Sequence, residues 1–253
     1  MRKQNCYGRE ALNSALLPAM LKLAPHLALL SLCLAIPAGP ALARTERPVV
    51  VELFTSQGCG ACTKANALVA DLAGRRDVLA LTFPVDYWDY LGWKDPFAKP
   101  EFSARQRAYM KAAGEREVFT PQVVVDGAPQ SDKSAVDKAP ALVKAALRSA
   151  PPEPAMMLSR GKVQVGSGPA PRGGADVWLV RYESQPQETE VKDGENRGVT
   201  VIYRNVAVGL EKLGSWTGRP RVYTLPKSRD GDIKTAVLLQ ARSGGRILGV
   251  LKP

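Results

Sequence analysis

Hydrophobic positions after residue 48 switch between short apolar runs and helical spacing. Residues 49–54 form an apolar run typical of a buried strand, and a polar turn follows at 55–58. Apolar side chains recur at helical spacing over 61–72, with Gly74 as a stop signal, and residues 77–86 again favour a strand. Two strands joined by a helical crossover predict a parallel, right-handed β-α-β unit.

The same alternation continues to residue 149. Residues 87–97 are too aromatic, and too interrupted by glycine and proline, for regular structure. We expect a helix over 101–113 and then a strand that begins at Pro121 and ends in an Asp126-Gly127 hairpin turn. Residues 134–149 favour a last helix. The order β-α-β-α-β-(β)-α predicts an α/β domain over residues 44–150.

After the proline-rich segment 151–154 the pattern changes to short strands separated by glycine-rich turns. This spacing predicts a β-rich, sandwich-like module over residues 155–253. Such a module could fold alone or pack as an accessory domain against the first one. The strands are expected over 162–165, 176–182, 198–206, 221–225, 234–240 and 246–250.

The first 43 residues have the features of a secretory signal peptide. Basic residues precede an apolar run at 27–36, which ends in Ala41-Leu42-Ala43. We therefore expect cleavage near Ala43 and a periplasmic or secreted protein, with an uncleaved anchor helix as the alternative. Initiation at Met20 would preserve these features, so the sequence leaves open whether Met1 or Met20 is the true start. No membrane span is expected after cleavage.

Cleavage would change the chemistry available to the chain. It would remove the single histidine, His26, and two of the four cysteines, Cys6 and Cys33. Catalysis through Ser-His-Asp or Cys-His systems and metal binding through histidine are thereby excluded for the mature protein. The net charge, +11 for the whole chain, would fall by three. The remaining charges are scattered without a nucleic-acid-binding motif, so no nucleic-acid partner is expected.

The two remaining cysteines form the motif Cys59-Gly-Ala-Cys62 where the first strand meets the first helix. The two intervening residues place both sulfurs within disulfide reach. Unpaired N–H groups at the start of a helix would stabilise a Cys59 thiolate, which could attack a disulfide while Cys62 resolves the mixed disulfide. The leading hypothesis is a thiol–disulfide oxidoreductase without a further cofactor. Its partners would be protein or small-molecule thiols and disulfides, and a redox partner in the cell envelope.

Residues 48–149 resemble the thioredoxin fold. They begin with a strand, the CxxC motif, a helix and a second strand. Thr120-Pro121 follows later, at the start of a strand, a hairpin and a helix. The resemblance implies that the Thr120–Pro121 peptide bond is cis, that Pro121 faces the dithiol and that Thr120 shapes substrate contact. Four segments are also similar to a family of exported bacterial thioredoxin-like proteins of unknown function. They are residues 51–59, 85–97, 120–127 and 194–198.

The chain departs from ordinary thioredoxins at two places. Gly58 stands where thioredoxins usually carry tryptophan. The dipeptide Gly60-Ala61 is neither the Gly-Pro of reducing members nor the Pro-His of strongly oxidising ones. The direction of electron flow therefore does not follow from the motif.

Further residues are candidates for the site. Glu52, seven positions before Cys59, could relay protons to Cys62 through water, or it could be an edge or surface glutamate. The residues Trp88, Asp89 and Trp93 could line a substrate groove beside the dithiol, or they could cap and pack an irregular loop. Lys64 could steady the Cys59 thiolate, or simply be solvated.

Two non-enzymatic hypotheses stand beside the enzyme. The cysteine pair of an exported protein could be an inert structural disulfide. Alternatively, Cys59 and Cys62 could bind a soft ion such as Cu(I), with Met156 or Met157 as a thioether ligand. Those methionines could equally pack at a domain interface.

Overall fold

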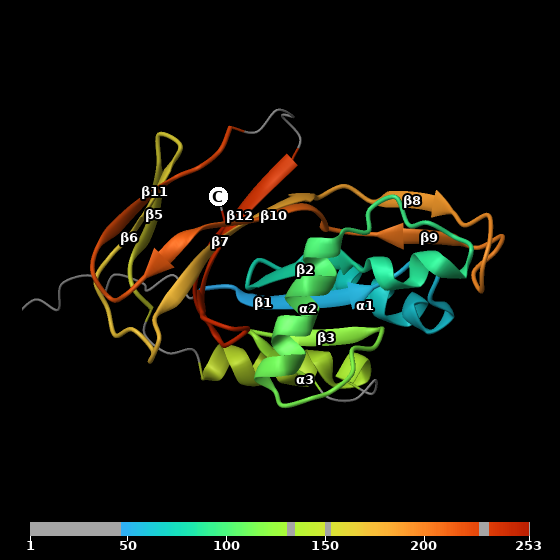
Figure 1. Cartoon of the computed structure of the whole chain (residues 1–253), viewed down its shortest axis with the longest axis horizontal. Helices are drawn as coiled ribbons and strands as arrows, with labels where there is room; N and C mark the ends of the chain where they lie inside the picture. Colours follow the sequence, from blue (N-terminus) through green and yellow to red (C-terminus); the bar gives the residue numbers. More distant parts are fainter. Residues whose placement is uncertain (1–46, 131–134, 150–152, 228–232, 253) are drawn as a thin grey trace, which may run out of the picture. The chain divides into compact units, whose positions relative to one another are not determined.

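The computed structural model describes residues 47–130, 135–149, 153–227 and 233–252 (Figure 1). The predicted signal peptide with its cleavage site, residues 151–152 of the proline-rich segment and residues 228–232 lie outside these residues. In the part of the chain that the structure describes, no helix is long and apolar enough to cross a membrane.

The predicted β-α-β unit is confirmed. Strands β1 (Val49–Thr55) and β2 (Val78–Pro84) pair in parallel from Val49 opposite Val78. Helix α1 (Thr63–Ala73) connects them, preceded by a short 3₁₀ helix, η1 (Gly60–Cys62). Every residue of both strands is buried, which explains why their sequences are nearly continuous apolar runs.

The predicted hairpin is also confirmed. Strand β3 (Gln122–Val125) runs antiparallel to β1 and turns into β4 (Ala128–Pro129). The two turn residues, Asp126 and Gly127, have φ angles of 48° and 77°. A two-residue turn of type I′ needs this left-handed conformation at both positions, which is why Asp-Gly is a strong hairpin signal.

Helices cover both faces of this sheet. Along β1, Val50 and Phe54 belong to one apolar cluster with residues of α2 (Pro100–Ala112), whereas Val51 and Leu53 belong to another with residues of α1 and α3 (Ala135–Arg148). Side chains alternate between the two faces of a strand, so β1 contributes to both clusters. The result is a thioredoxin-like α/β layer arrangement.

The C-terminal strands extend this same sheet. The order is β13-β12-β7-β10-β2-β1-β3-β4, and β10 joins β2 in parallel, with Val206 opposite Thr82. The junction is reinforced by Thr82, whose N–H donates to the carbonyl of Asn205 at 3.0 Å, and by the Asn205 side chain, which donates to the carbonyl of Ala80 at 2.8 Å. The added strands are β7 (Ala175–Glu183), β10 (Val206–Trp216), β12 (Ile233–Ala241) and β13 (Ile247–Leu251).

Two smaller antiparallel sheets complete the β-rich part, so the predicted fold class is confirmed. Figure 1 shows the hairpin β8–β9 at the end of the molecule where β1 ends, and the three-stranded sheet at the opposite end. The hairpin consists of β8 (Gln187–Glu190) and β9 (Thr200–Tyr203), and the other sheet of β5 (Met156–Ser159), β6 (Lys162–Val165) and β11 (Arg221–Thr224).

Several element boundaries differ from the expectation. The single strand expected over 198–206 is two strands, β9 and β10, separated by a turn at Asn205 with a φ of 46°. Strand β8 was not expected because Gln187–Glu190 contains no apolar residue. Most of β10 was also missed, since its register shifts next to Gly209 and Gly214 interrupt the alternation of apolar and polar positions. The irregular segment 87–97 contains part of a 3₁₀ helix, η2 (Asp86–Leu91).

Candidate functional site

The cysteine pair lies where β1 leads into the first helical turn. Cys59 and Cys62 form a disulfide, with their Cα atoms 5.4 Å apart. The Cys62 N–H donates to the Cys59 carbonyl at 3.1 Å, which closes the turn. Cys59 is 1% exposed and Cys62 is fully buried. The expected disulfide reach is confirmed, but neither sulfur lies open on the surface.

A carboxylate occupies the helix N-terminus that was expected to stabilise a Cys59 thiolate. The N–H of Gly60, inside the CxxC motif, donates to Glu195 Oε2 at 3.1 Å. A negative charge is stabilised at this position by the unpaired N–H groups and the helix dipole. Glu195 comes from the turn between β8 and β9, far along the chain. Its carboxylate holds a donor that would also favour a Cys59 thiolate if the disulfide were open.

The same turn contacts the motif through a second residue. The side-chain amide of Asn196 donates to the backbone carbonyl of Gln57 at 2.7 Å. A Cβ atom added to Gly60 would lie 3.2 Å from Glu195 Oε2 and 3.8 Å from Asn196 Oδ1, so the turn packs directly over the motif. This is the segment 194–198 that resembled the exported family. We call residues 192–197 the lid loop.

Gln57 is held in place by hydrogen bonds to three other residues. Its N–H donates to Asp95 Oδ2 at 3.0 Å, and its side-chain oxygen accepts from Trp93 Nε1 at 2.9 Å. With its carbonyl bound to Asn196, only its side-chain nitrogen is left without a hydrogen-bond partner among the described residues. Gln57 is fully buried, and these contacts fix the loop that leads to Cys59.

Asp95 connects the loop before the cysteines to the β8–β9 hairpin. Besides Gln57, its carboxylate accepts from the Phe97 N–H at 2.9 Å and from the Tyr203 hydroxyl at 2.8 Å. Burial raises the pKa of Asp95, although these three hydrogen bonds lower it in part. A carboxylate that is 2% exposed and saturated with donors is typical of a structural support rather than of a solvent-exposed catalytic acid.

The residues that resembled the thioredoxin cis-proline lie near the end of β1. The Thr120–Pro121 peptide bond is cis, as the resemblance implied. Strand β3 begins at Gln122, opposite Phe54, so Pro121 stands next to the point where β1 ends. Both Thr120 and Pro121 are buried. Their contact with substrate stays a prediction.

The three residues expected to line a groove have separate contacts. Trp88 packs beside the motif, because a Cβ added to Gly58 would lie 3.7 Å from the Cβ of Trp88. Trp93 orients Gln57, as described above. Asp89 Oδ1 accepts from the Asp95 N–H at 3.3 Å, and burial raises the pKa of Asp89. All three therefore support the loop around Cys59, and a substrate groove along them stays a prediction.

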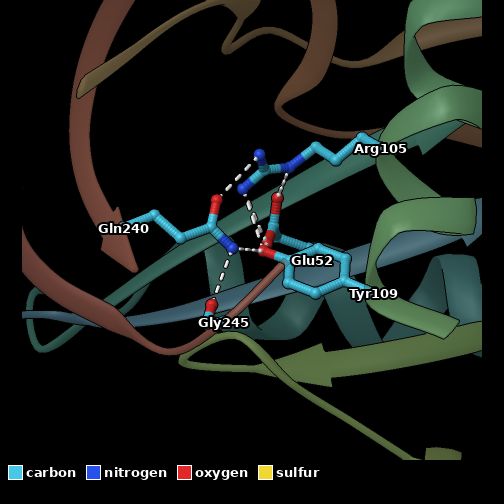
Figure 2. A network of polar contacts seen from close by, with 5 residues as sticks. All are labelled: Glu52, Arg105, Tyr109, Gln240 and Gly245. Carbon is cyan, nitrogen blue, oxygen red and sulfur yellow. Dashed lines mark hydrogen bonds and ion pairs between the residues drawn. The ribbon is translucent and has the colours of Figure 1, made fainter. Parts of the chain in front are cut away.

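Glu52 is neither an edge nor a surface residue but the centre of a buried polar network (Figure 2). Its carboxylate accepts from Arg105 Nε at 2.6 Å and from Arg105 Nη2 at 3.2 Å, and the Tyr109 hydroxyl donates to it as well. Gln240 closes the network by accepting from Arg105 Nη1 at 3.2 Å and by donating to Tyr109 at 3.0 Å and to the Gly245 carbonyl at 2.8 Å.

The network balances the cost of burying charge. Burial alone lowers the pKa of Arg105, but the adjacent Glu52 charge outweighs it and the pKa is raised. The pKa of Tyr109 is raised well above its usual value, mainly by burial. These partners engage Glu52 on the face of β1 that α2 covers. The predicted proton relay to Cys62 would require the carboxylate to serve two sites, and it stays a prediction.

A separate cavity of about 350 Å³ lies beside this network. It is lined by residues of α2 and of strands β7, β10 and β12, among them Ala108, Trp178 and Leu210. Neither cysteine lines it. The cavity and the disulfide are therefore different places in the fold.

Other residues considered from the sequence lie elsewhere. Lys64 forms an ion pair with Asp137 at 2.5 Å, which links α1 to α3. Met156 packs into the apolar cluster of the three-stranded sheet, at the opposite end of the molecule from the end of β1 (Figure 1). This packing agrees with the alternative of an interior role for Met156, and copper binding by Cys59 and Cys62 with Met156 or Met157 stays a prediction. Within the described residues, no group of three or more His, Cys, Asp or Glu side chains could hold a metal ion.

The sequence assigned no role to three residues that shape the site: Gln57, Glu195 and Asn196. The signal for the last two was the similarity of segment 194–198 to the exported family, to which no physical role could be assigned. Their role depends on contacts between segments more than 130 residues apart, as in the hydrogen bond from Asn196 to Gln57 with a separation of 139.

Comparison with known proteins identifies a matching family and similar solved structures. Residues 50–240 match the family model described as "Protein of unknown function (DUF1223)". The fold is similar to the crystal structure of protein AGR_C_4864 from Agrobacterium tumefaciens, with 31% identity, a TM-score of 0.66, and coverage of 81% of this chain and 94% of that one.

A more distant likeness shows the fold alone. HBP35 of Porphyromonas gingivalis is 13% identical, with a TM-score of 0.54 and coverage of 82% of this chain and 75% of that one. No curated protein matches the chain. The family match spans well over half of the sequence and agrees with the structural likeness. The chain therefore belongs to the DUF1223 family of proteins of unknown function.

Proposed function

We propose that this protein is a thiol–disulfide oxidoreductase of the periplasm or the extracellular space. The observation that carries the proposal is the Cys59–Cys62 disulfide at the start of the first helix of a thioredoxin-like fold. The cis Thr120–Pro121 bond, just before the start of β3 and near the end of β1, supports it. The helix N-terminus favours a thiolate when the disulfide is open, because N–H groups and the helix dipole point toward it. The signal-peptide features of residues 1–43 support export.

In the oxidising direction, a substrate dithiol reduces the Cys59–Cys62 disulfide in two steps. A substrate thiolate attacks the Cys59 sulfur, a new S–S bond forms, and the Cys59–Cys62 bond breaks with its electron pair on Cys62. A second substrate thiolate then attacks the substrate sulfur of this mixed disulfide and releases Cys59 as a thiolate. Two electrons and two protons pass from the substrate dithiol to the cysteine pair. The reduced pair runs the same steps backward on a substrate disulfide.

Thr120 and Pro121 would present the substrate backbone to Cys59, and a redox partner that is itself a dithiol or disulfide would return the pair to its starting state. No further cofactor is required, because both electrons are carried by the sulfur atoms. The direction depends on the reduction potential of the pair against those of its partners.

The reduction potential of the mature protein, equilibrated with glutathione, tests the proposal. A potential of roughly −270 to −120 mV is expected, the range of exchangeable thioredoxin-like sites. A potential below about −300 mV would overturn the proposal, since such disulfides resist reduction by thiol pools.

The burial of both sulfurs favours a second candidate, an inert structural disulfide. A disulfide of this kind stabilises the fold and does not exchange. The two candidates differ in one observable. An oxidoreductase should exchange with a model disulfide substrate, whereas for a structural disulfide the wild type should show no such exchange and Cys59→Ser should change only the melting temperature, which should fall.

A further inference from the structure

Disulfide exchange needs access that the closed structure does not provide. An attacking sulfur must approach one sulfur of the disulfide directly, so exchange rates depend on access. Cys59 is 1% exposed and Cys62 is 0% exposed. For exchange to occur, something that covers the pair has to move.

The lid loop is the segment in position to move. Glu195 binds the Gly60 N–H, Asn196 binds the Gln57 carbonyl, and Asp193 lies against Gly92, where an added Cβ would be 3.1 Å from Asp193 Oδ2. These contacts are made by polar side chains at the tip of a hairpin. Water can replace each of these contacts when the tip moves away, because opening exchanges a hydrogen bond to the protein for one to water.

The base of the hairpin is anchored independently of the tip. Val191, Val201 and Tyr203 belong to an apolar cluster with Trp93 and Phe97. The base is closed by backbone hydrogen bonds, including those of Val191 N–H to the Val199 carbonyl at 3.0 Å and of Gly198 N–H to the Val191 carbonyl at 2.8 Å. The tip can therefore leave the motif while the hairpin stays attached to the rest of the protein.

Two residues beside the motif carry polar groups without a partner among the described residues. The side-chain nitrogens of Gln57 and Trp88 are buried and have no hydrogen-bond partner in the described part of the chain. Gln57 is oriented by Trp93, so its free donor is fixed in place. Buried donors without a partner are costly in a finished interior and are expected where a substrate's carbonyl oxygen takes their place.

We propose that the lid loop, residues 192–197, closes over the disulfide and opens for exchange, and that Glu195 is the positioning residue that couples lid closure to the oxidised state. The inference rests on the proposed oxidoreductase function. In the oxidised protein the Glu195 carboxylate takes the Gly60 N–H without competition. On reduction, a Cys59 thiolate competes for the same helix N-terminus and repels the carboxylate, so the lid opens and the dithiol becomes less favourable.

Two variants of the mature protein separate charge from closure. Glu195→Gln keeps a hydrogen-bond acceptor for Gly60 but removes the charge. It should shift the glutathione equilibrium toward the dithiol by about threefold to tenfold, which equals about 15–30 mV. Asn196→Ala removes the contact with Gln57 and should make reduction by dithiothreitol several-fold faster. Glu188→Gln, an exposed glutamate on β8, is the matched control and should change neither quantity.

Gly60→Ala provides an additional test that leaves the lid sequence intact. Its methyl group would lie 3.2 Å from Glu195 Oε2, and it should therefore push the lid outward and speed reduction as Asn196→Ala does. Circular dichroism of each variant establishes that it is folded.

The outcomes distinguish the two proposals. A wild-type disulfide that does not exchange overturns the oxidoreductase function itself. A wild type that exchanges normally, with Glu195→Gln, Asn196→Ala and Gly60→Ala all at wild-type equilibrium and rate, overturns the lid alone. A Glu195→Gln equilibrium shifted toward the disulfide also overturns it, because the charge would then stabilise the dithiol.

Discussion

Asn196 donates its side-chain amide to the backbone carbonyl of Gln57, 139 residues earlier in the chain, at 2.7 Å. This bond joins a turn of the β-rich part to the loop that carries Cys59. The two parts that the sequence pattern separated thus build one site, and they also share the eight-stranded sheet. The disulfide environment is therefore set by residues on both sides of the proline-rich segment.

Serine variants of the two cysteines should behave differently in disulfide exchange. Because Cys59 attacks and Cys62 resolves in the proposed mechanism, Cys59→Ser should abolish dithiol exchange with a model disulfide peptide. Cys62→Ser should instead accumulate mixed disulfides, visible as species of higher mass on non-reducing gels. Wild-type exchange by Cys59→Ser would contradict the assigned roles.

The Glu52–Arg105 pair should dominate the stability of the α2 face. Glu52→Gln leaves the Arg105 charge buried without its counterion, so the free energy of unfolding should fall by about 3–5 kcal/mol. Urea denaturation monitored by tryptophan fluorescence measures the loss. Replacing both residues by methionine should cost less than the sum of the two single replacements, since no buried charge remains uncompensated.

The same Glu52→Gln variant tests the predicted proton relay. A role that is only structural leaves the pH dependence of exchange unchanged in molecules that are folded. A relay to Cys62 would shift the pH profile of the resolving step. The measurement is the rate of mixed-disulfide resolution between pH 5 and 9, compared with wild type.

Asp95 should make stability depend on pH. Its pKa in the folded protein is raised by burial above the ordinary carboxyl value, so the folded state binds a proton more readily than the unfolded state. In the window between the ordinary value and the raised one, wild-type stability should fall as pH increases, relative to Asp95→Asn. Thermal unfolding of both proteins across this window measures the difference. A constant difference would contradict the prediction.

Tyr203 should hold the base of the β8–β9 hairpin. Tyr203→Phe removes the hydroxyl that donates to Asp95 but keeps the ring in its apolar cluster. The expected loss of stability is about 1.5–3 kcal/mol, the value of a hydrogen bond to a charged group. The loosened hairpin should also expose the disulfide, so reduction by dithiothreitol should be faster than in wild type. Tyr90→Phe, at an exposed position, is the control for loss of a hydroxyl.

Gly244 should tolerate no side chain. Its φ is +75°, and an added Cβ would lie 2.5 Å from the Ala108 carbonyl oxygen on α2. Gly244→Ala therefore strains the backbone and displaces the β12–β13 turn from α2, at a cost of about 1–3 kcal/mol. Gly161→Ala is a suitable comparison, because its φ is +70° and nothing lies within 4 Å of the added atom. Gly161→Ala therefore has the backbone strain without the clash. If it loses as much stability as Gly244→Ala, the contact between Gly244 and Ala108 has no role of its own.

Local patterns in the sequence determined much of the thioredoxin-like part. Continuous apolar runs marked β1 and β2, helical spacing marked α1, and Asp126-Gly127 marked the hairpin, because these signals arise from residues close together in the chain. The CxxC spacing likewise determined that Cys59 and Cys62 can form a disulfide. Strands with little apolar content, such as β8, carry no such local signal and were missed.

Only the tertiary structure decided what surrounds the disulfide and Glu52. Alternation along β1 placed Glu52 on one face of a strand, but it did not show that Arg105 and Tyr109 would bind it there. Nor did it show that Glu195 would reach the Gly60 N–H from 135 residues away. Such contacts depend on how the sheet continues from β2 to β10 and on where the β8–β9 hairpin then packs. That packing is a property of the whole chain, since no local stretch of sequence contains both partners.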